Sequence, residues 1–379
     1  MNEVSNIVLK KITRHIYEER MPLPEYQKTN IRIERVNNRN FAELWFLTAG
    51  CRHDRQGGCT MCNYGKGRTC WEDEILREIE KTIAQMPEEY EEFIISPIGS
   101  MLDEREVSDH MMRGLKDALQ NIHSETLITE TRADTVTKER LMMLKNIFDA
   151  RYRCVEIGVE SSSDWILRNC VNKGCTVEDY KRAIAAIKEA GMIAIVNIGI
   201  GIPFMSERMA VEHAIESVCR ADMWGADSIV LFPYHVKPGT LAGVLYELGE
   251  YQPVSLWSLV EVLDSLELRI QSKTRISWYK NYYKEPDKII SSPGTCPACY
   301  EEVLSLLEEY KNLMKPETIR SLVQMECSCK IRWRERLRDE ALQIDLERME
   351  KNYRTLSERY GVSPRLLERE LEFMRDTYR

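Results

Sequence analysis

Residues 51–62 read CRHDRQGGCTMC, and the tripeptide NYG follows directly. Cys51, Cys59 and Cys62 are therefore spaced C-x7-C-x2-C, straight after the apolar run Leu44–Leu47. Thiolates at such spacing are typical ligands of a soft metal centre. We predict a [4Fe-4S] cluster, in which three protein ligands leave one iron open. Half of a zinc site and three buried thiols are the alternatives.

An open iron can take the amino and carboxylate groups of S-adenosylmethionine (SAM). One electron from the cluster can then cleave the sulfonium and give a 5′-deoxyadenosyl radical, which abstracts hydrogen. Met61, between the last two cysteines, is the apolar residue expected to pack on the adenine. The commonest form of this signature is C-x3-C-x2-C, so the longer first spacing indicates a subgroup.

Composition indicates an ordinary soluble protein. The chain has 379 residues, enough for a barrel-sized domain with appendages. No apolar run approaches a membrane span, and the N-terminal sequence lacks the long apolar core of a signal peptide. With 12 cysteines and no export signal, reduced thiols and metal centres are favoured over disulfides. We expect a cytoplasmic, oxygen-sensitive protein without membrane association.

The charge balance limits the kinds of partner. The formal net charge is −8, which argues against nucleic-acid binding through overall charge. A local basic patch remains compatible with this balance.

From Phe41 onward, strand-like runs alternate with helical patterns, as in parallel β/α units. The predicted strands are Glu43–Thr48, Glu92–Pro97, Thr126–Thr131, Arg153–Glu160, Ile193–Ile202 and Ser228–Tyr234. The predicted helices are Glu72–Gln85, Ser108–Asn121, Lys138–Phe148, Val177–Ala190 and Glu207–Arg220. This order predicts an α/β fold, a partial (β/α)6 barrel over residues 39–275.

Two further regions flank the predicted barrel. Residues 1–38 are expected to form a cap, with one amphipathic helix followed by a breaker segment at Pro22 and Pro24. Residues 276–379 are expected to form a C-terminal region with a cysteine-bearing helical extension and a charged helical tail. The tail is expected on the surface or at a subunit interface.

In such barrels the site lies at the C-terminal ends of the strands. Gly99 and Ser100 follow the second predicted strand, where glycine lets the backbone approach a ligand. Charges inside apolar strands are costly unless paired, so Glu130, Arg132 and Glu160 are expected to point into the barrel mouth. An arginine fork suits the methionyl carboxylate, and a carboxylate suits ribose hydroxyls. A structural Arg–Glu network is the alternative.

The sixth predicted strand leads into Tyr234, His235 and Lys237. These residues are candidate catalytic residues that contact the substrate or the adenine. His235 is a candidate acid or base, and a structural histidine is the alternative.

Several motifs recur together in one known family. They are CRHDRQGGCTMCNYG, PIGSMLD, ETRADTV, EIGVESSSDWILRNCVNKGCTVEDY and GTLAGVLYELGEYQPVSLWSLVEVL. Over about residues 40–330 the chain resembles radical SAM enzymes, in particular the radical SAM subunit of archaeosine synthase and its relatives, and the elongator catalytic subunit more generally. The resemblance implies a [4Fe-4S] cluster on Cys51, Cys59 and Cys62. It implies SAM-binding positions at Met61, Gly99, Ser100, Glu130, Arg132, Glu160 and Ser161.

The resemblance also implies a reaction. Archaeosine synthesis acts on tRNA carrying a lysine-modified 7-deazaguanine, where radical cleavage of the lysine C–N bond leaves a formamidine. An electron donor such as flavodoxin or ferredoxin is expected. Radical tailoring of, or sulfur insertion into, a small biosynthetic metabolite is the alternative substrate class. A non-catalytic zinc-binding protein is the remote alternative.

A second cysteine set follows the predicted barrel. Cys296 and Cys299 form C-x2-C, and Cys327 and Cys329 form C-x-C about thirty residues later. The sequence leaves two possibilities open, a zinc ion that staples the C-terminal region and an auxiliary iron–sulfur cluster. The other cysteines, Cys70, Cys154, Cys170, Cys175 and Cys219, are mostly expected to be buried thiols.

Aromatic residues interleave with lysines between the two cysteine sets. Residues 278–283 read WYKNYY. The pattern favours a half-buried strand, and a surface that stacks on a base is the alternative.

Overall fold

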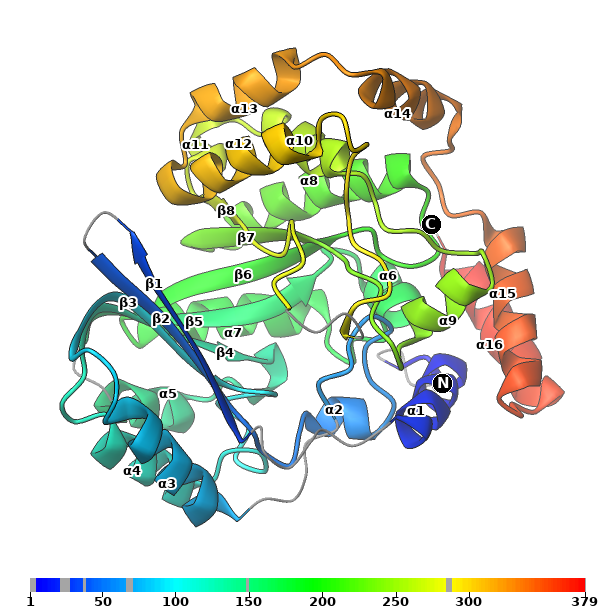
Figure 1. Cartoon of the computed structure of the whole chain (residues 1–379). Coiled ribbons are helices and arrows are strands. Elements are labelled where there is room, and N and C mark those ends of the chain that lie inside the picture. The colour runs from blue at the N-terminus through cyan, green and yellow to red at the C-terminus, as the bar shows by residue number, and fades with distance from the viewer. Residues whose placement is uncertain are drawn as a thin grey trace.

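The computed structural model describes residues 5–20, 28–36, 39–65, 71–147, 150–283 and 288–378. Its centre is one curled sheet of eight strands in the order β1 to β8 (Figure 1). The strands are β1 Thr29–Val36, β2 Arg39–Phe46, β3 Glu89–Pro97, β4 His123–Thr131, β5 Ala150–Glu160, β6 Ile193–Ile200, β7 Ser228–Pro233 and β8 Thr274–Ile276. β1 pairs antiparallel with β2, and every other pair of neighbours is parallel.

Helices follow the parallel strands as the alternating pattern predicts. The connecting helices are α2 Arg52–Arg55, α3 Glu72–Ile83, α4 Asp109–Ala118, α5 Lys138–Ile147, α6 Asp164–Ile166, α7 Val177–Glu189, α8 Glu207–Met223, α9 Leu241–Glu247, α10 Leu256–Asp264 and α11 Leu268–Gln271, with short turns η1 Ala133–Thr135 and η2 Leu167–Val171. The terminal helices are α1 Ile7–Glu19, α12 Tyr300–Leu313, α13 Pro316–Gln324, α14 Ser328–Asp339, α15 Leu346–Arg359 and α16 Pro364–Thr377. The α/β half-barrel with a cysteine-bearing helical extension is confirmed.

The sheet is wider than the six strands expected. β8 has three residues, too few to give a pattern of alternation. β1 lies inside the segment expected to be a cap, and its charged residues concealed it. Arg32 of β1 forms an ion pair with Glu43 of β2, so these charges belong to cross-strand pairs. Pro22 and Pro24 lie outside the described residues.

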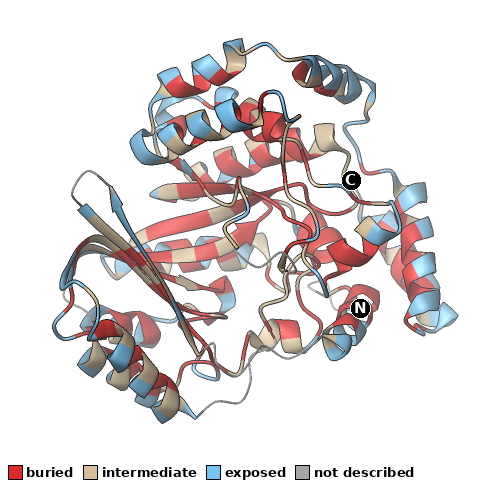
Figure 2. Cartoon of the chain, in the orientation of Figure 1, coloured by how far each residue is buried: buried red, intermediate tan, exposed pale blue. Residues whose placement is uncertain are grey.

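The main core lies between the sheet and its outer helices. Along β2, Ala42, Leu44 and Phe46 are buried in one large apolar cluster that also contains α3 residues such as Ile75 and Ile79. Figure 2 shows buried strands surrounded by helices whose outer sides are exposed. The inward side of the sheet is apolar only over a small cluster of Ile128, Cys154, Ile195 and Val230.

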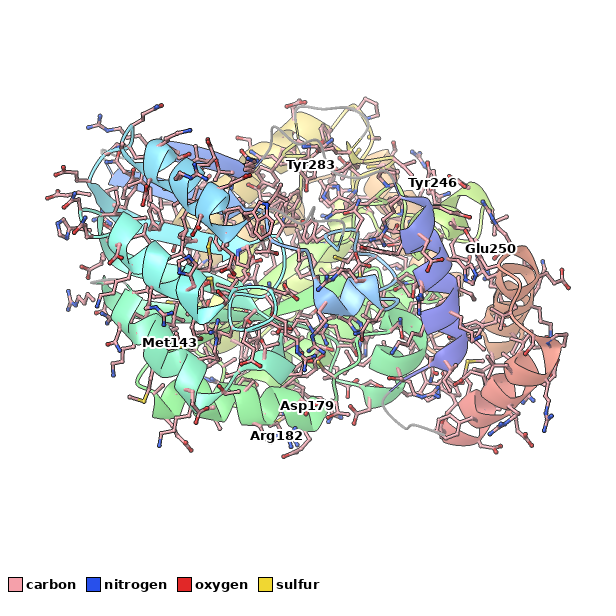
Figure 3. All side chains as sticks on the ribbon, turned by 90° about the horizontal axis from the view of Figure 1, so that it is seen from below. Met143, Asp179, Arg182, Tyr246, Glu250 and Tyr283 are labelled. Atoms are coloured by element: carbon pink, nitrogen blue, oxygen red, sulfur yellow. The ribbon has the colours of Figure 1, made fainter. Side chains whose placement is uncertain are left out.

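A second core joins the two ends of the chain. α1 packs with α15 and α16, and Figure 3 shows α1 standing between α2 and these two helices. Tyr353 of α15 donates to the Asn169 carbonyl at 2.6 Å, and Asn6 donates to the Tyr353 hydroxyl at 3.1 Å. A fully buried ion pair joins Arg168 to Glu370 of α16. The charged tail is therefore helical, as expected, and its buried side packs on this same chain.

Two smaller expectations have clear outcomes. The half-buried strand over residues 278–283 is wrong, because β8 ends at Ile276 and Trp278 has φ of 52°, a left-handed conformation unsuited to a strand. Cys154, Cys170 and Cys175 are buried as expected, Cys219 is half-buried, and Cys70 lies outside the described residues. In the described part of the chain, no helix is long and apolar enough to cross a membrane.

Candidate active site

The loop that carries the first three cysteines leaves the C-terminal end of β2. Cys51 is the N-cap residue of α2, and Cys59 and Cys62 follow that helix. The three thiols are half-buried and form no disulfide. A four-iron cluster binds each thiolate through a different iron.

An arginine from the N-terminal helix closes this loop. Arg20, directly after α1, pairs with the buried Asp54 and donates to the Cys62 carbonyl at 2.9 Å and to the Gly239 carbonyl at 2.5 Å. Asp54 also accepts from the Gly65 N–H at 2.6 Å. The Arg20 guanidinium thus links Asp54, near the start of the cysteine loop, and Cys62, at its end, to Gly239 in the loop that follows β7.

The segment after β5 holds the loop from its other side. The Asn172 side chain donates to the Gly57 and Gly58 carbonyls at 2.9 and 2.8 Å. The Thr60 hydroxyl donates to the Cys170 carbonyl at 2.8 Å. Because Asn172 has φ of 54°, a short polar side chain suits this position. Side-chain hydrogen bonds to backbone carbonyls therefore position this loop.

Glu106 connects the cysteine loop to the turn after β3. Its carboxylate accepts from the backbone N–H groups of Arg52 and Ser100, each at 2.7 Å. Burial raises the pKa of Glu106 to about 7, while the two N–H donors act in the opposite direction. A Cβ on Gly99 would lie 2.1 Å from this carboxylate, so Glu106 accounts for the glycine at that position. The Ser100 hydroxyl also has a partner, because the backbone N–H of Arg132 donates to it at 2.8 Å.

Two cations lie beside the thiols. Burial raises the pKa of Cys51 and of Cys59 to about 12, whereas the Arg132 guanidinium lowers both and the Lys173 ammonium lowers that of Cys59. Nε and Nη2 of Arg132 bond to Asp134, to the Lys173 carbonyl and to Cys175, at 2.9 to 3.1 Å. No described residue bonds to Nη1 of this guanidinium. Although the net effect is a raised pKa, the two cations are the groups that favour the thiolate forms of Cys51 and Cys59.

Lys173 was missed from the sequence, although it stands in the quoted motif VNKGC. Its ammonium donates to Glu160 at 2.9 Å, and the Tyr234 hydroxyl donates to the other oxygen of that carboxylate at 2.8 Å. All three side chains are buried. Burial alone would lower the pKa of Lys173, but Glu160 raises it. Glu160 is therefore a paired carboxylate, with Lys173 rather than Arg132 as its partner.

Glu130 lies beside a second carboxylate on the inward side of the sheet. Glu130 of β4 and Glu156 of β5 are register partners on parallel strands. Burial and the Glu156 charge raise the pKa of Glu130 well above its usual range, and burial raises that of Glu156 to about 7. The pair therefore retains a proton near neutral pH. One member can then donate a hydrogen bond while the other accepts one.

Ser161 and Met61 have different surroundings. Ser161 is fully buried and shares a hydrogen bond of 2.8 Å with Nε2 of His213. Met61 is half-buried beside the second core. Of these two proposed SAM contacts, Met61 is the one whose side chain remains partly accessible.

The residues after β7 divide into buried and accessible groups. His235 is buried, with Nε2 at 2.6 Å from the Trp278 carbonyl and Nδ1 at 3.0 Å from the Ser292 hydroxyl. Because a carbonyl only accepts, Nε2 carries the hydrogen, and burial lowers the pKa of His235 to about 4. Both ring nitrogens are thus occupied. These contacts favour the structural alternative for this histidine.

Lys237 instead joins a half-buried aromatic group. Its ammonium donates to the Tyr64 hydroxyl at 3.0 Å and lies 4.3 Å from the centre of that ring. It lies 5.4 Å from the Trp278 ring, whose centre is 5.4 Å from that of Tyr283. Burial raises the pKa of Cys62 and Lys237 acts in the opposite direction, so this cation–aromatic group borders the cysteine loop.

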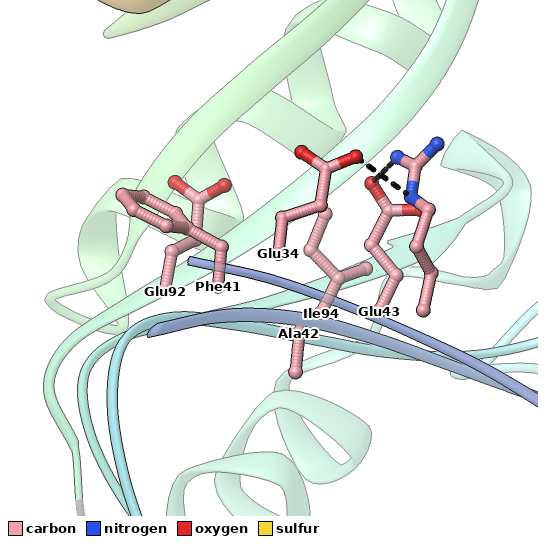
Figure 4. A pocket seen from close by; sticks show the side chains of 7 residues that line it. Glu34, Phe41, Ala42, Glu43, Glu92 and Ile94 are labelled. Atoms are coloured by element: carbon pink, nitrogen blue, oxygen red, sulfur yellow. Dashed lines mark hydrogen bonds and ion pairs between the residues drawn. The ribbon is translucent and has the colours of Figure 1, made fainter. Parts of the chain in front are cut away.

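A small hollow elsewhere on the sheet serves no site. It is lined by Arg32, Glu34, Phe41, Ala42, Glu43, Glu92 and Ile94 (Figure 4). Arg32 pairs with Glu34 and Glu43, and Glu92 pairs with Arg275 at 3.0 Å. Glu34 also pairs with Lys311 at 3.9 Å, so the three carboxylates of the hollow face three cations of the protein.

Arg20→Ala is expected to weaken the cysteine loop. The change leaves Asp54 buried without its partner, which costs about 3–5 kcal/mol. Arg20→Lys restores a charge but not the fork that reaches two carbonyls. We expect both variants to lose bound iron during anaerobic gel filtration, with a larger loss in Arg20→Ala. Arg14→Ala breaks an exposed pair on the same helix and is the control. Full iron retention in Arg20→Ala would contradict this role.

Comparison with known proteins identifies the family. Residues 45–215 match the model of the radical SAM superfamily. The chain is 31% identical to archaeosine synthase subunit beta of Methanosarcina acetivorans, over 76% of this chain and 82% of that protein. It is 26% identical to the Thermococcus kodakarensis protein of the same name, over 76% and 88%.

A solved structure of Elp3 from Methanocaldococcus infernus is also similar. It matches with 20% identity and a TM-score of 0.46, over 64% of this chain and 57% of that one. One conclusion follows from the family model, the subunit beta matches and the cysteine loop at the strand ends. The chain belongs to the radical SAM superfamily, in the family that contains the archaeosine synthase beta subunits, and it is an enzyme.

Proposed function

We propose that this enzyme acts on a modified nucleoside in tRNA, with a radical C–N bond cleavage like that of archaeosine synthesis. The observation that carries the proposal is the C-x7-C-x2-C loop held at the strand ends in a chain 31% identical to an archaeosine synthase beta subunit. When bound, a [4Fe-4S] cluster and SAM supply the hydrogen-abstracting 5′-deoxyadenosyl radical.

The chain's own residues have proposed roles in this chemistry. Cys51, Cys59 and Cys62 hold the cluster, and their cationic neighbours compensate the thiolate charge. The free Nη1 of Arg132 suits the methionyl carboxylate of SAM. Glu130 suits the ribose hydroxyls, because its carboxylate has no hydrogen-bond partner among the described side chains and its raised pKa allows it to donate or accept.

Accessory components follow from the same comparison. The relatives are subunits by name, which supports a partner subunit that delivers the substrate. The reaction needs one electron per SAM, for which flavodoxin or ferredoxin is proposed. The cysteines Cys296, Cys299, Cys327 and Cys329 are proposed to bind a second metal.

The substrate test uses tRNA that carries the lysine-modified 7-deazaguanine. Reduced, cluster-loaded enzyme with SAM is incubated with this tRNA, and nucleosides are quantified by mass spectrometry. The proposal predicts loss of the modified nucleoside together with formation of 5′-deoxyadenosine. Cleavage of SAM with the tRNA left unchanged would contradict the RNA substrate and favour a small metabolite.

Trp278→Ala is expected to weaken substrate binding. Stacking of a base on an aromatic ring contributes about 1–3 kcal/mol, so KM for the RNA should rise about tenfold or more. SAM cleavage without substrate should stay the same. Tyr152→Ala is the control. The Tyr152 ring also lies beside a cation, with its centre 5.0 Å from the Arg151 guanidinium, but Tyr152 stands near the start of β5, at the end of the strand opposite to the site. An equal effect of both variants on KM would refute base stacking at Trp278.

A further inference from the structure

Four cysteines from two distant segments converge at the ends of two helices. Cys299 is the N-cap residue of α12 and Cys327 that of α14. The four sulfur atoms all lie within 4.8 Å of one another. The closest pairs are Cys296–Cys299 at 3.7 Å, Cys296–Cys327 at 3.4 Å, Cys299–Cys329 at 3.5 Å and Cys327–Cys329 at 3.5 Å.

These distances indicate the kind of metal. A zinc ion binds thiolate sulfur at about 2.3 Å, and a tetrahedron of that radius has edges of about 3.8 Å. A disulfide would need about 2.05 Å. The four thiolates of a four-iron cluster each bind a different iron and therefore stand further apart than the ligands of one ion. The observed spacing fits one tetrahedral ion.

The surroundings suit the charge of such a site. Four thiolates on a divalent ion carry a net charge of minus two. The Trp257 indole N–H donates to the Cys329 sulfur at 3.2 Å. The N-termini of α12 and α14, helices of 14 and 12 residues, point their partial positive charge at the thiolates. These donors form the outer contacts that a thiolate–metal site requires.

The sparse packing of α14 gives a metal at this site a structural role. α14 buries little of its own surface, and among its described residues only Lys330 and Trp333 are buried. Trp333 donates to the Ser258 hydroxyl of α10 at 3.0 Å, and the Lys330 ammonium donates to three carbonyls at the end of α13. A metal that joins the starts of α12 and α14 would supply what this sparse apolar contact lacks. In Figure 1 these helices lie far from α2 and the first cysteine loop.

We propose that Cys296, Cys299, Cys327 and Cys329 bind one structural zinc ion that docks α14 on α10 and α12. The site has four protein ligands, so it leaves no open position for substrate or SAM. It also holds no sulfide, so it cannot serve as a sulfur donor. This inference does not depend on the reaction proposed above.

X-ray absorption at the zinc edge of the full-length wild-type protein, purified anaerobically, tests the proposal. We expect one zinc per chain, with four sulfur neighbours at about 2.3 Å and no nitrogen or oxygen ligands. Zinc bound through nitrogen or oxygen, or iron in place of zinc, would overturn the assignment. This measurement needs no variant and therefore does not depend on how well a variant folds.

A double variant then locates the ion. Cys327→Ser/Cys329→Ser should lose the zinc, keep the iron of the first site, and unfold at a lower temperature than wild type. Cys219→Ser, a half-buried thiol on α8, is the control and should keep both metals. Loss of half the iron from the double variant would instead show an auxiliary cluster. The iron of the first site reports on the proposed function separately, so the two proposals can fail independently.

Discussion

Cys59→Ala is expected to reduce SAM cleavage to background. The change removes one of three thiolates that hold the proposed cluster, and Cys59 is the thiol on which Lys173 and Arg132 both act against the pKa increase that burial causes. The remaining two thiolates cannot hold the cluster firmly, because a second iron would then lack a protein ligand. Formation of 5′-deoxyadenosine by the reduced, reconstituted protein is measured by liquid chromatography, beside iron and sulfide content.

The same loss is expected from Cys51→Ala and Cys62→Ala. Cys170→Ala is the matched control, because Cys170 is buried in the segment that holds the cysteine loop and is not a proposed ligand. The control should keep its iron and its SAM cleavage. Undiminished 5′-deoxyadenosine from any of the three ligand variants would remove that residue from the cluster.

Lys173→Met is expected to be strongly destabilising. The side chains of Lys173 and Glu160 are 8% and 7% exposed, so the change leaves a carboxylate buried without its cation. Breaking such a pair costs about 3–5 kcal/mol. Anaerobic urea unfolding measures this loss. Lys188→Met removes one partner of an exposed pair with Asp227 and should cost at most about 1 kcal/mol.

The double variant Lys173→Met/Glu160→Gln separates stability from cofactor binding. Removing both charges should restore most of the free energy of unfolding, because neither partner is left unpaired. If Glu160 also binds SAM, affinity for SAM should still fall about tenfold or more, since a hydrogen bond to a charged group contributes about 1.5–3 kcal/mol. Recovery of both stability and SAM affinity would assign Glu160 a purely structural role.

Much of the fold could be predicted because strands that are buried on both faces produce near-continuous apolar runs. β4 to β7 lie close to their predicted positions for this reason. β1 escaped prediction because the charge of Arg32 is compensated by Glu34 and, on the neighbouring strand, by Glu43. A cross-strand pair of this kind cannot be inferred from the sequence until the register of the two strands is known. The strand expected around Trp278 failed because an aromatic run predicts burial better than it predicts backbone conformation.

The site could be predicted where the chemistry depends on local spacing. The two cysteine sets have short spacings that metal ligands require, and the structure gathers the second set tightly. Arg20 carried no such signal, because it reaches Asp54 and Cys62 only through the packing of α1 against the loop. Lys173 was equally hidden, since its partner Glu160 lies on a strand and the pairing depends on the turn between them.

One measurement tests the central claim most directly. Wild-type protein is reconstituted anaerobically with iron and sulfide, reduced, and given SAM, and 5′-deoxyadenosine is quantified against a sample without reductant. The radical SAM assignment predicts 5′-deoxyadenosine only in the reduced sample, in an amount that rises with the iron bound to the first cysteine set. A protein with a full complement of reduced iron that leaves SAM intact would contradict it.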